Sequence, residues 1–179
     1  MSHPVTLTVI ALIVAGSTQA QSSFTELKAR IGYDLRKADG STVSVSHLKD
    51  KPVVVLLFSS GSCSPCEELA KQLVPVYKKH GGGKTFEVIL VSSDKSESAM
   101  YRHMKGCGMP WLAAPFQEGQ DYAPELRKAY TGSESGIPRV ILIDRYDNVL
   151  LRNDAFVKGR VLTNKQFLGA LVREIGRDR

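Results

Sequence analysis

Two cysteines separated by two residues are the side chains in this sequence best suited to carry out chemistry. Cys63 and Cys66 enclose Ser64 and Pro65, and they come directly after an apolar run at residues 53–58. A stretch with helical periodicity follows them at once. A C-x-x-C pair at a turn from a strand into a helix is typical of a dithiol that cycles with a disulfide. The sequence therefore predicts a redox-active pair formed by Cys63 and Cys66.

The predicted position of Cys63 at the start of a helix gives the two thiols different roles. Unpaired N–H groups and the helix dipole stabilise an anion at a helix N-terminus, which lowers the pKa of a thiol there. Because the thiolate attacks disulfides, we expect Cys63 to be the exposed, attacking residue. We expect Cys66, one turn further along the same face, to be more buried and to resolve the mixed disulfide. Pro65 falls in the first helical turn, where its missing N–H costs nothing.

Other interpretations of the cysteines have less support. A zinc site usually takes four ligands, but the sequence has no second C-x-x-C pair and its four histidines are scattered. A purely structural disulfide is the other alternative, and the strand-turn-helix setting disfavours it. The third cysteine, Cys107, lies in no clear motif, so we expect a small buried side chain, with a second redox or regulatory thiol as the alternative. We therefore predict neither a metal site nor an organic cofactor.

Length and charge narrow the class of protein further. The chain of 179 residues is long enough for one domain with a sizeable core. Its net charge of +6 comes from Lys and Arg spread along the chain, with no basic stripe interleaved with aromatic residues. Nucleic-acid binding is therefore not expected. Such a surface instead favours acidic protein partners through electrostatic steering.

The first twenty residues have the pattern of a signal peptide. An apolar run at residues 5–15 has the length of a signal core and is too short to span a membrane. Because Lys and Arg are missing before this run, an uncleaved anchor and a misassigned start codon remain alternatives. We predict a signal peptide at residues 1–20 and an exported, monomeric domain at residues 21–179. That domain is expected to have no membrane span and to work in the periplasm or outside the cell.

Apolar patterns and turn signals predict alternating strands and helices. Strands are expected at residues 53–58, 86–92, 139–144 and 149–152, with two short extended stretches within residues 31–45. Helices are expected at residues 66–80, 96–104, 122–130 and 164–175, with a short helical turn at residues 46–50. Continuous apolar runs are typical of strands that are covered on both faces. The sequence thus predicts one α/β domain with a central mixed sheet flanked by helices.

Three of these features together resemble the thioredoxin superfamily: the buried strand, the C-x-P-C segment, and Gly136-Ile137-Pro138 before the third long strand. In that family the peptide bond before the matching proline is cis, and its backbone faces the active-site sulfurs. The resemblance implies a thioredoxin-like fold in which Ile137 and Pro138 help to hold the substrate chain. A trans proline that simply starts a strand is the alternative.

A second motif narrows the resemblance to the tryparedoxin and nucleoredoxin branch. Residues 109–116 read Met-Pro-Trp-Leu-Ala-Ala-Pro-Phe, and residues 125–130 also resemble that branch. The resemblance implies a thiol–disulfide oxidoreductase that acts on protein thiols and disulfides and depends on an upstream redox partner. It also implies that the residues around the dithiol contact the substrate, namely Ser62, Ser64, Pro65 and Trp111. On physical grounds we expect Trp111 to be a core or near-site aromatic residue, and these grounds favour that role.

Three positions depart from these relatives. Ser62 stands where the branch has a tryptophan that shapes the partner surface, and Glu67 stands where tryparedoxins usually have a basic residue. Leu57 matches the buried aspartate through which thioredoxin transfers protons, so the proton acceptor for Cys66 must be water or another group.

Two alternative functions remain open. One is a binding module that is redox-inactive or holds Cu(I) through two soft thiolates. The other is a dedicated thiol reductase of cytochrome c maturation.

Overall fold

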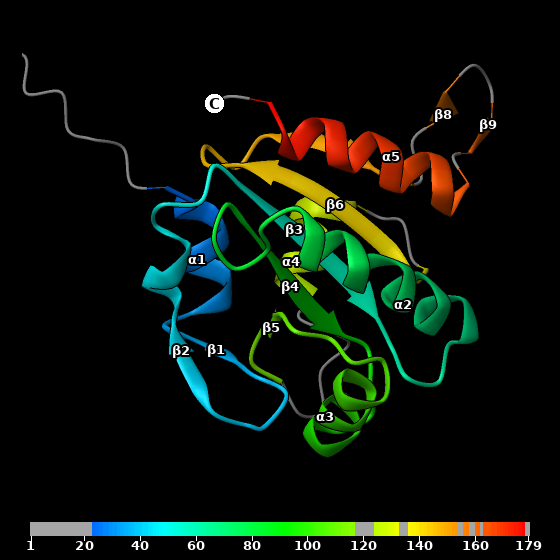
Figure 1. Ribbon diagram of the computed structural model, residues 1–179. Coiled ribbons are helices and arrows are strands. Elements are labelled where there is room, and N and C mark those ends of the chain that lie inside the picture. The colour runs from blue at the N-terminus through cyan, green and yellow to red at the C-terminus, as the bar shows by residue number, and fades with distance from the viewer. Residues whose placement is uncertain are drawn as a thin grey trace, which may run out of the picture.

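A mixed β-sheet forms the centre of the molecule (Figure 1). The computed structural model describes residues 23–116, 124–132, 136–153, 156–157, 160–161 and 163–177. Within these ranges, seven strands form one sheet in the order β2-β1-β5-β4-β3-β6-β7. The strands are β1 (Asp34–Arg36), β2 (Thr42–Ser44), β3 (Val53–Ser59), β4 (Phe86–Ser92), β5 (Leu112–Ala113), β6 (Arg139–Asp144) and β7 (Val149–Arg152). A separate pair consists of β8 (Phe156–Val157) and β9 (Arg160–Val161).

The two strands with continuous apolar runs lie in the middle of this sheet. β3 pairs in parallel with β4 and antiparallel with β6, so that Leu57 lies between Leu90 and Val140. All seven residues of β3 are buried, because helices cover both faces of the sheet. The predicted mixed sheet is confirmed, and its last two strands, β6 and β7, form an antiparallel hairpin.

Helices cover both faces, as predicted. The helices are α1 (Thr25–Ile31), α2 (Ser64–Lys79), α3 (Glu97–Gly106), α4 (Pro124–Thr131), α5 (Asn164–Ile175) and the short 3-10 helix η1 (Val45–Leu48). α2, α3 and α5 contribute to one core cluster, and α1 and α4 contribute to the cluster on the opposite face. α5 begins at the predicted residue because Thr163 and Gln166 form a capping box there.

Four of the described elements, α1, β5, β8 and β9, were not predicted from the sequence. Two of them, α1 and β5, depend on distant contacts. The first turn of α1 is capped by Asp147, whose carboxylate accepts hydrogen bonds from the N–H groups of Glu26 (3.0 Å) and Leu27 (3.1 Å). β5 has two residues and is defined by its pairing with β1 and β4.

The predicted signal peptide at residues 1–20 lies outside the described residues. Among the residues that are described, no helix combines the length and the apolar character that crossing a membrane requires.

Candidate active site

The two cysteines of the C-x-x-C motif form a disulfide at the start of α2. Cys63 is the N-cap residue of this helix, and its Cα atom lies 5.2 Å from that of Cys66. Cys63 is partly exposed, whereas Cys66 is completely buried. The predicted difference in exposure is confirmed, while the attacking and resolving roles remain predictions.

The first turn of α2 gives the Cys63 sulfur an electrostatic environment that suits a thiolate. The carbonyl oxygen of Cys63 accepts hydrogen bonds from the N–H groups of Cys66 (2.9 Å) and Glu67 (3.1 Å). Its own N–H donates to the Ser60 carbonyl oxygen (3.2 Å), which closes the turn after β3. The positive end of the helix dipole therefore lies at Cys63 and stabilises negative charge there.

The segment before β6 lies beside the disulfide. The Ile137–Pro138 peptide bond is cis, as the resemblance implied, and the Ile137 carbonyl oxygen lies 3.9 Å from the Cys63 Sγ atom. Asn153 holds this segment in place: its amide donates to the Pro138 carbonyl oxygen (3.1 Å) and accepts from the Val140 N–H (3.0 Å). Ile137 and Pro138 are partly exposed, so their backbone is accessible next to the sulfur atoms.

The other predicted contact residues divide into two groups. Ser62, Ser64 and Pro65 are exposed around the disulfide and form its rim. Trp111 is 1% exposed and packs edge-to-face against Tyr77, with 5.6 Å between ring centroids. It therefore lies in the core, where its contribution is packing. Direct contact between Trp111 and a substrate stays a prediction, and this buried ring offers almost no surface for it.

Sequence reasoning missed a polar cluster next to the disulfide, centred on the buried carboxylate of Asp94. One Asp94 oxygen accepts hydrogen bonds from the Gly61 N–H (2.9 Å) and the Ser60 hydroxyl (3.1 Å). The other accepts from the Ser92 hydroxyl (2.8 Å) and lies 3.5 Å from Nδ1 of His103. Burial alone would raise the pKa of Asp94, but His103, the Gly61 N–H and Ser92 outweigh it and hold the pKa below its ordinary value of 3.8.

A signal for this cluster was present in the sequence. The polar residues at positions 92–94 follow the apolar run of β4, and the residues at positions 59–62 follow that of β3. Because β3 and β4 are parallel neighbours, their carboxyl ends lie at the same edge of the sheet. The pairing of Ser59 with Ser92 brings the two polar segments together there.

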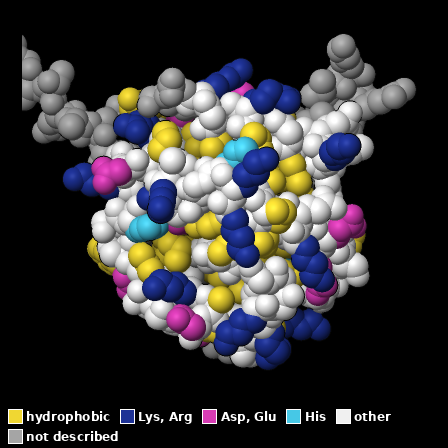
Figure 2. Space-filling view, viewed as in Figure 1, with side chains coloured by type: hydrophobic (Ala, Val, Ile, Leu, Met, Phe, Trp, Pro, Cys, Tyr) yellow, Lys and Arg dark blue, Asp and Glu magenta, His cyan; other side chains and the backbone are white. Residues whose placement is uncertain are grey.

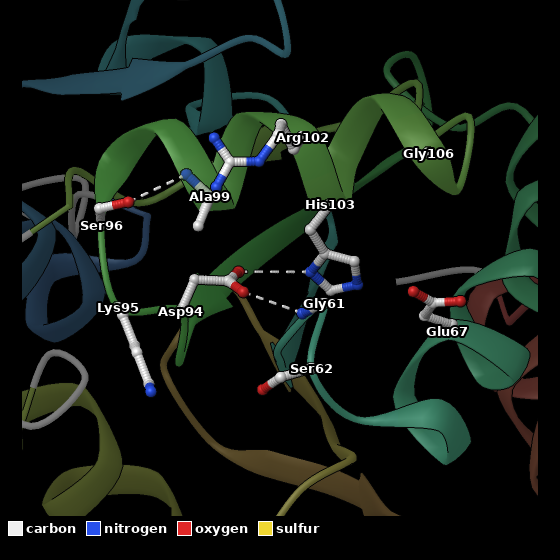
Figure 3. Close-up of a pocket in the computed structure, with 10 residues that line it drawn as sticks. All are labelled: Gly61, Ser62, Glu67, Asp94, Lys95, Ser96, Ala99, Arg102, His103 and Gly106. Carbon is white, nitrogen blue, oxygen red and sulfur yellow. Dashed lines mark hydrogen bonds and ion pairs between the residues drawn. The ribbon is translucent and has the colours of Figure 1, made fainter.

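A cavity of about 500 Å³ opens between α3 and the C-x-x-C turn (Figure 3). Both charge signs are present among its lining residues, which are Gly61, Ser62, Glu67, Asp94, Lys95, Ser96, Ala99, Arg102, His103 and Gly106. Figure 3 shows His103 pointing from α3 toward Asp94, with Glu67 reaching in from α2. Among the described residues, no three His, Cys, Asp or Glu side chains are grouped closely enough to hold a metal ion.

Two further residues that the sequence analysis singled out are buried. Leu57 is completely buried in the core. Cys107, at the end of α3, is a free thiol that is 7% exposed, as predicted for a small buried side chain. Burial raises the pKa of the Cys107 thiol, and the nearby carboxylate of Glu67 adds to this effect.

Comparisons with known proteins agree on one group of relatives. A family model described as Thioredoxin-like matches residues 51–149. Tryparedoxin from Trypanosoma brucei brucei is 37% identical over 113 residues, covering 63% of this chain and 74% of that protein. Probable nucleoredoxin 1 from Arabidopsis thaliana is 34% identical over 121 residues, covering 66% of this chain but 20% of that longer protein. The structure of tryparedoxin I from Leishmania major superposes with a TM-score of 0.61 at 26% identity, covering 86% of this chain and 98% of that one.

Proposed function

Because this chain belongs to the thioredoxin-like family, in its tryparedoxin and nucleoredoxin branch, we propose that it is a thiol–disulfide oxidoreductase acting on protein disulfides. One observation carries the proposal. The Cys63–Cys66 disulfide lies at the start of α2, with one sulfur accessible, the other buried, and the Ile137 carbonyl beside the accessible one. This arrangement makes the Cys63 sulfur accessible to a partner, while the buried Cys66 sulfur is within bonding distance of it.

The proposed reaction moves two electrons from the dithiol to the substrate. The Cys63 thiolate attacks one sulfur of a substrate disulfide, forms a mixed disulfide and releases the other substrate sulfur as a thiolate. The Cys66 thiol then loses its proton and attacks Cys63 Sγ. This step forms the Cys63–Cys66 disulfide, breaks the mixed disulfide and releases the second substrate thiolate. The substrate is reduced to two thiols and the protein is oxidised.

An upstream dithiol must return the protein to its reduced state in this direction. The same steps run in reverse when the Cys63–Cys66 disulfide oxidises a substrate, and the reduction potentials of the two partners decide which direction prevails. In either direction the partner's chain lies along the exposed rim of Ser62, Ser64 and Pro65 and the backbone of Ile137 and Pro138. No organic cofactor or metal takes part in these steps.

The N-terminal apolar run supports a proposal for where the protein works, and the surface charge supports a proposal for its partners. We propose that residues 1–20 direct export and that the domain works as a monomer in the periplasm or outside the cell. Figure 2 shows Lys and Arg side chains dispersed over the face that carries α2, α3 and α5, with Asp and Glu among them. Such dispersed charge, with a net value of +6, suits acidic protein partners better than a nucleic-acid backbone.

Reduction of insulin by dithiothreitol tests the activity. The wild-type protein is expected to accelerate precipitation of the insulin B chain, whereas the Cys63→Ser variant is expected to leave the uncatalysed rate unchanged. The Cys107→Ser variant serves as the matched control and should keep the wild-type rate. Equal rates for wild type and Cys63→Ser would contradict the proposal. One Cu(I) ion per chain in the purified protein, together with no disulfide exchange, would favour the metal-binding module instead.

A further inference from the structure

His103 is a polar side chain buried beside the candidate active site. Its side chain is 0% exposed, and neither ring nitrogen makes a hydrogen bond to the described residues. Its polar contact is the ion pair in which Nδ1 lies 3.5 Å from the Asp94 carboxylate. A buried polar group without hydrogen bonds destabilises the folded state. We therefore expect this histidine to have a role other than stabilising the core.

Asp94 connects His103 to the turn that carries Cys63. The carboxylate that faces His103 also accepts hydrogen bonds from the Gly61 N–H and the Ser60 hydroxyl. The Ser60 oxygen in turn accepts a hydrogen bond from the Ser62 N–H (3.3 Å). Asp94 thus holds three consecutive residues, and the next residue in the chain is Cys63. A displacement of this carboxylate would change the path of the backbone into the active site.

His103 also contacts the same turn directly. A Cβ atom added at Gly61 would lie 3.1 Å from Cβ and 3.4 Å from Cγ of His103, which is closer than most side chains approach. The histidine therefore packs against the bare backbone of Gly61 (Figure 3). Through this contact, and through its ion pair with Asp94, His103 connects α3 to the Ser60–Ser62 turn.

His103 also affects the balance of charge near the dithiol. The charged and titratable groups that line the cavity with His103 are Asp94, Lys95 and Arg102, together with Glu67 from α2. Ser62 and Glu67, which adjoin Cys63 and Cys66 in the chain, line the same cavity. Negative charge beside Cys63 disfavours its thiolate, and a positive or hydrogen-donating imidazole beside Asp94 offsets that charge.

We propose that His103 is a positioning residue for the dithiol, which holds Asp94 and the Ser60–Ser62 turn in place and balances the Asp94 charge at the turn that leads into Cys63. This proposal rests on the proposed function, but it concerns equilibrium properties of the cysteine pair. Without His103, the uncompensated carboxylate disfavours the reduced, thiolate-bearing state. The Cys63–Cys66 pair then becomes harder to reduce.

The test is the equilibrium constant for reduction of the pair by glutathione, together with the pH profile of Cys63 thiolate formation. His103→Leu removes the imidazole and its N–H, and we expect its constant for reduction to fall about tenfold, which is about 30 mV for a two-electron couple. His103→Asn keeps an N–H near the position of Nδ1. We expect it to stay within about threefold of wild type at pH 7, because it can still donate a hydrogen bond toward Asp94. His80→Asn, a partly exposed histidine at the other end of α2, should match wild type in both measurements.

Two results would overturn the proposal. One is a His103→Leu variant with the wild-type constant and the wild-type pH profile. The other is a His103→Asn variant whose constant falls about tenfold or more although it keeps the N–H, and this variant decides the matter if His103→Leu fails to fold. Insulin reduction separates this proposal from the proposed function. A wild-type protein that does not reduce insulin, but whose constant responds to His103, contradicts the function and supports the positioning role.

Discussion

The Sγ atom of Cys63 lies 3.9 Å from the carbonyl oxygen of Ile137, although the two residues are 74 positions apart in the chain. The pairing of β3 with β6 brings them together, because Phe58 of β3 lies opposite Arg139 of β6. Cys63 follows the end of one strand and Ile137 precedes the start of the other. The sheet therefore places one accessible sulfur against one accessible backbone segment.

The difference in exposure between the two cysteines predicts a difference in their reactivity. In the reduced protein we expect iodoacetamide to modify Cys63 at least about tenfold faster than Cys66, because Cys63 is partly exposed at the helix N-terminus. Cys66→Ser and Cys63→Ser variants isolate each thiol, and mass spectrometry of the folded proteins reports which residue is modified. Faster modification of Cys66 than of Cys63 would contradict the assignment of their roles.

Cys107 is predicted to be unreactive in the folded protein. Burial and the neighbouring Glu67 raise the pKa of its thiol, so its reactive thiolate is scarce at neutral pH. In the oxidised protein, where Cys63 and Cys66 form a disulfide, iodoacetamide should modify Cys107 only after unfolding in guanidinium chloride. Rapid modification of Cys107 in the folded protein would instead support the alternative of a second redox thiol.

Gly61 is predicted to tolerate no side chain. In a Gly61→Ala variant, the new methyl group would lie 3.1 Å from Cβ of His103, so either the turn or α3 must shift. We expect the free energy of unfolding to fall by about 1–3 kcal/mol, which urea denaturation measures. Gly169→Ala in α5 is the matched control, since its methyl group would meet only the flexible end of Arg173 at 3.8 Å. An unchanged stability for Gly61→Ala would show that the contact with His103 is looser than described.

The strands and helices nearest the active site were predictable because their signals are local. The continuous apolar run of β3, the helical spacing of α2 and the hydroxyl of Ser96, which caps α3, all lie within the elements that they define. The same holds for the Cys63–Cys66 pair. Its spacing and its place between a strand and a helix are properties of one short segment.

Helix α1 and the polar cluster of Asp94 were missed because they depend on residues far apart in the chain. α1 has seven residues and is capped by Asp147, more than a hundred positions away, so no local pattern marks its start. The Asp94–His103 cluster appears only once β3 and β4 are placed side by side. The burial of Trp111 against Tyr77 confirms the core role that was expected on physical grounds, and packing determines it.

Low pH is predicted to reduce the free energy of unfolding, partly because Asp94 becomes protonated. The surroundings of Asp94 hold its pKa in the folded state below 3.8, so its ionised form contributes stability above that pH. This contribution begins to be lost when the pH falls below the ordinary pKa of 3.8. It is lost fully once the pH is below the lower pKa of the folded state. The difference in the free energy of unfolding between wild type and Asp94→Asn should therefore shrink as the pH falls below 3.8. Measuring both proteins in the same buffers cancels the groups that do not interact with Asp94, and a difference that grows as the pH falls below 3.8 would contradict the direction of the shift.

Trapping the mixed disulfide tests the central claim most directly. The Cys66→Ser variant lacks the thiol that resolves this intermediate, so it should accumulate as a covalent adduct when mixed with a protein that carries an accessible disulfide. Mass spectrometry after digestion should locate the new bond at Cys63, and dithiothreitol should release it. An adduct at Cys107, or no adduct with Cys66→Ser under conditions where the wild-type protein reduces the same substrate, would contradict attack by Cys63.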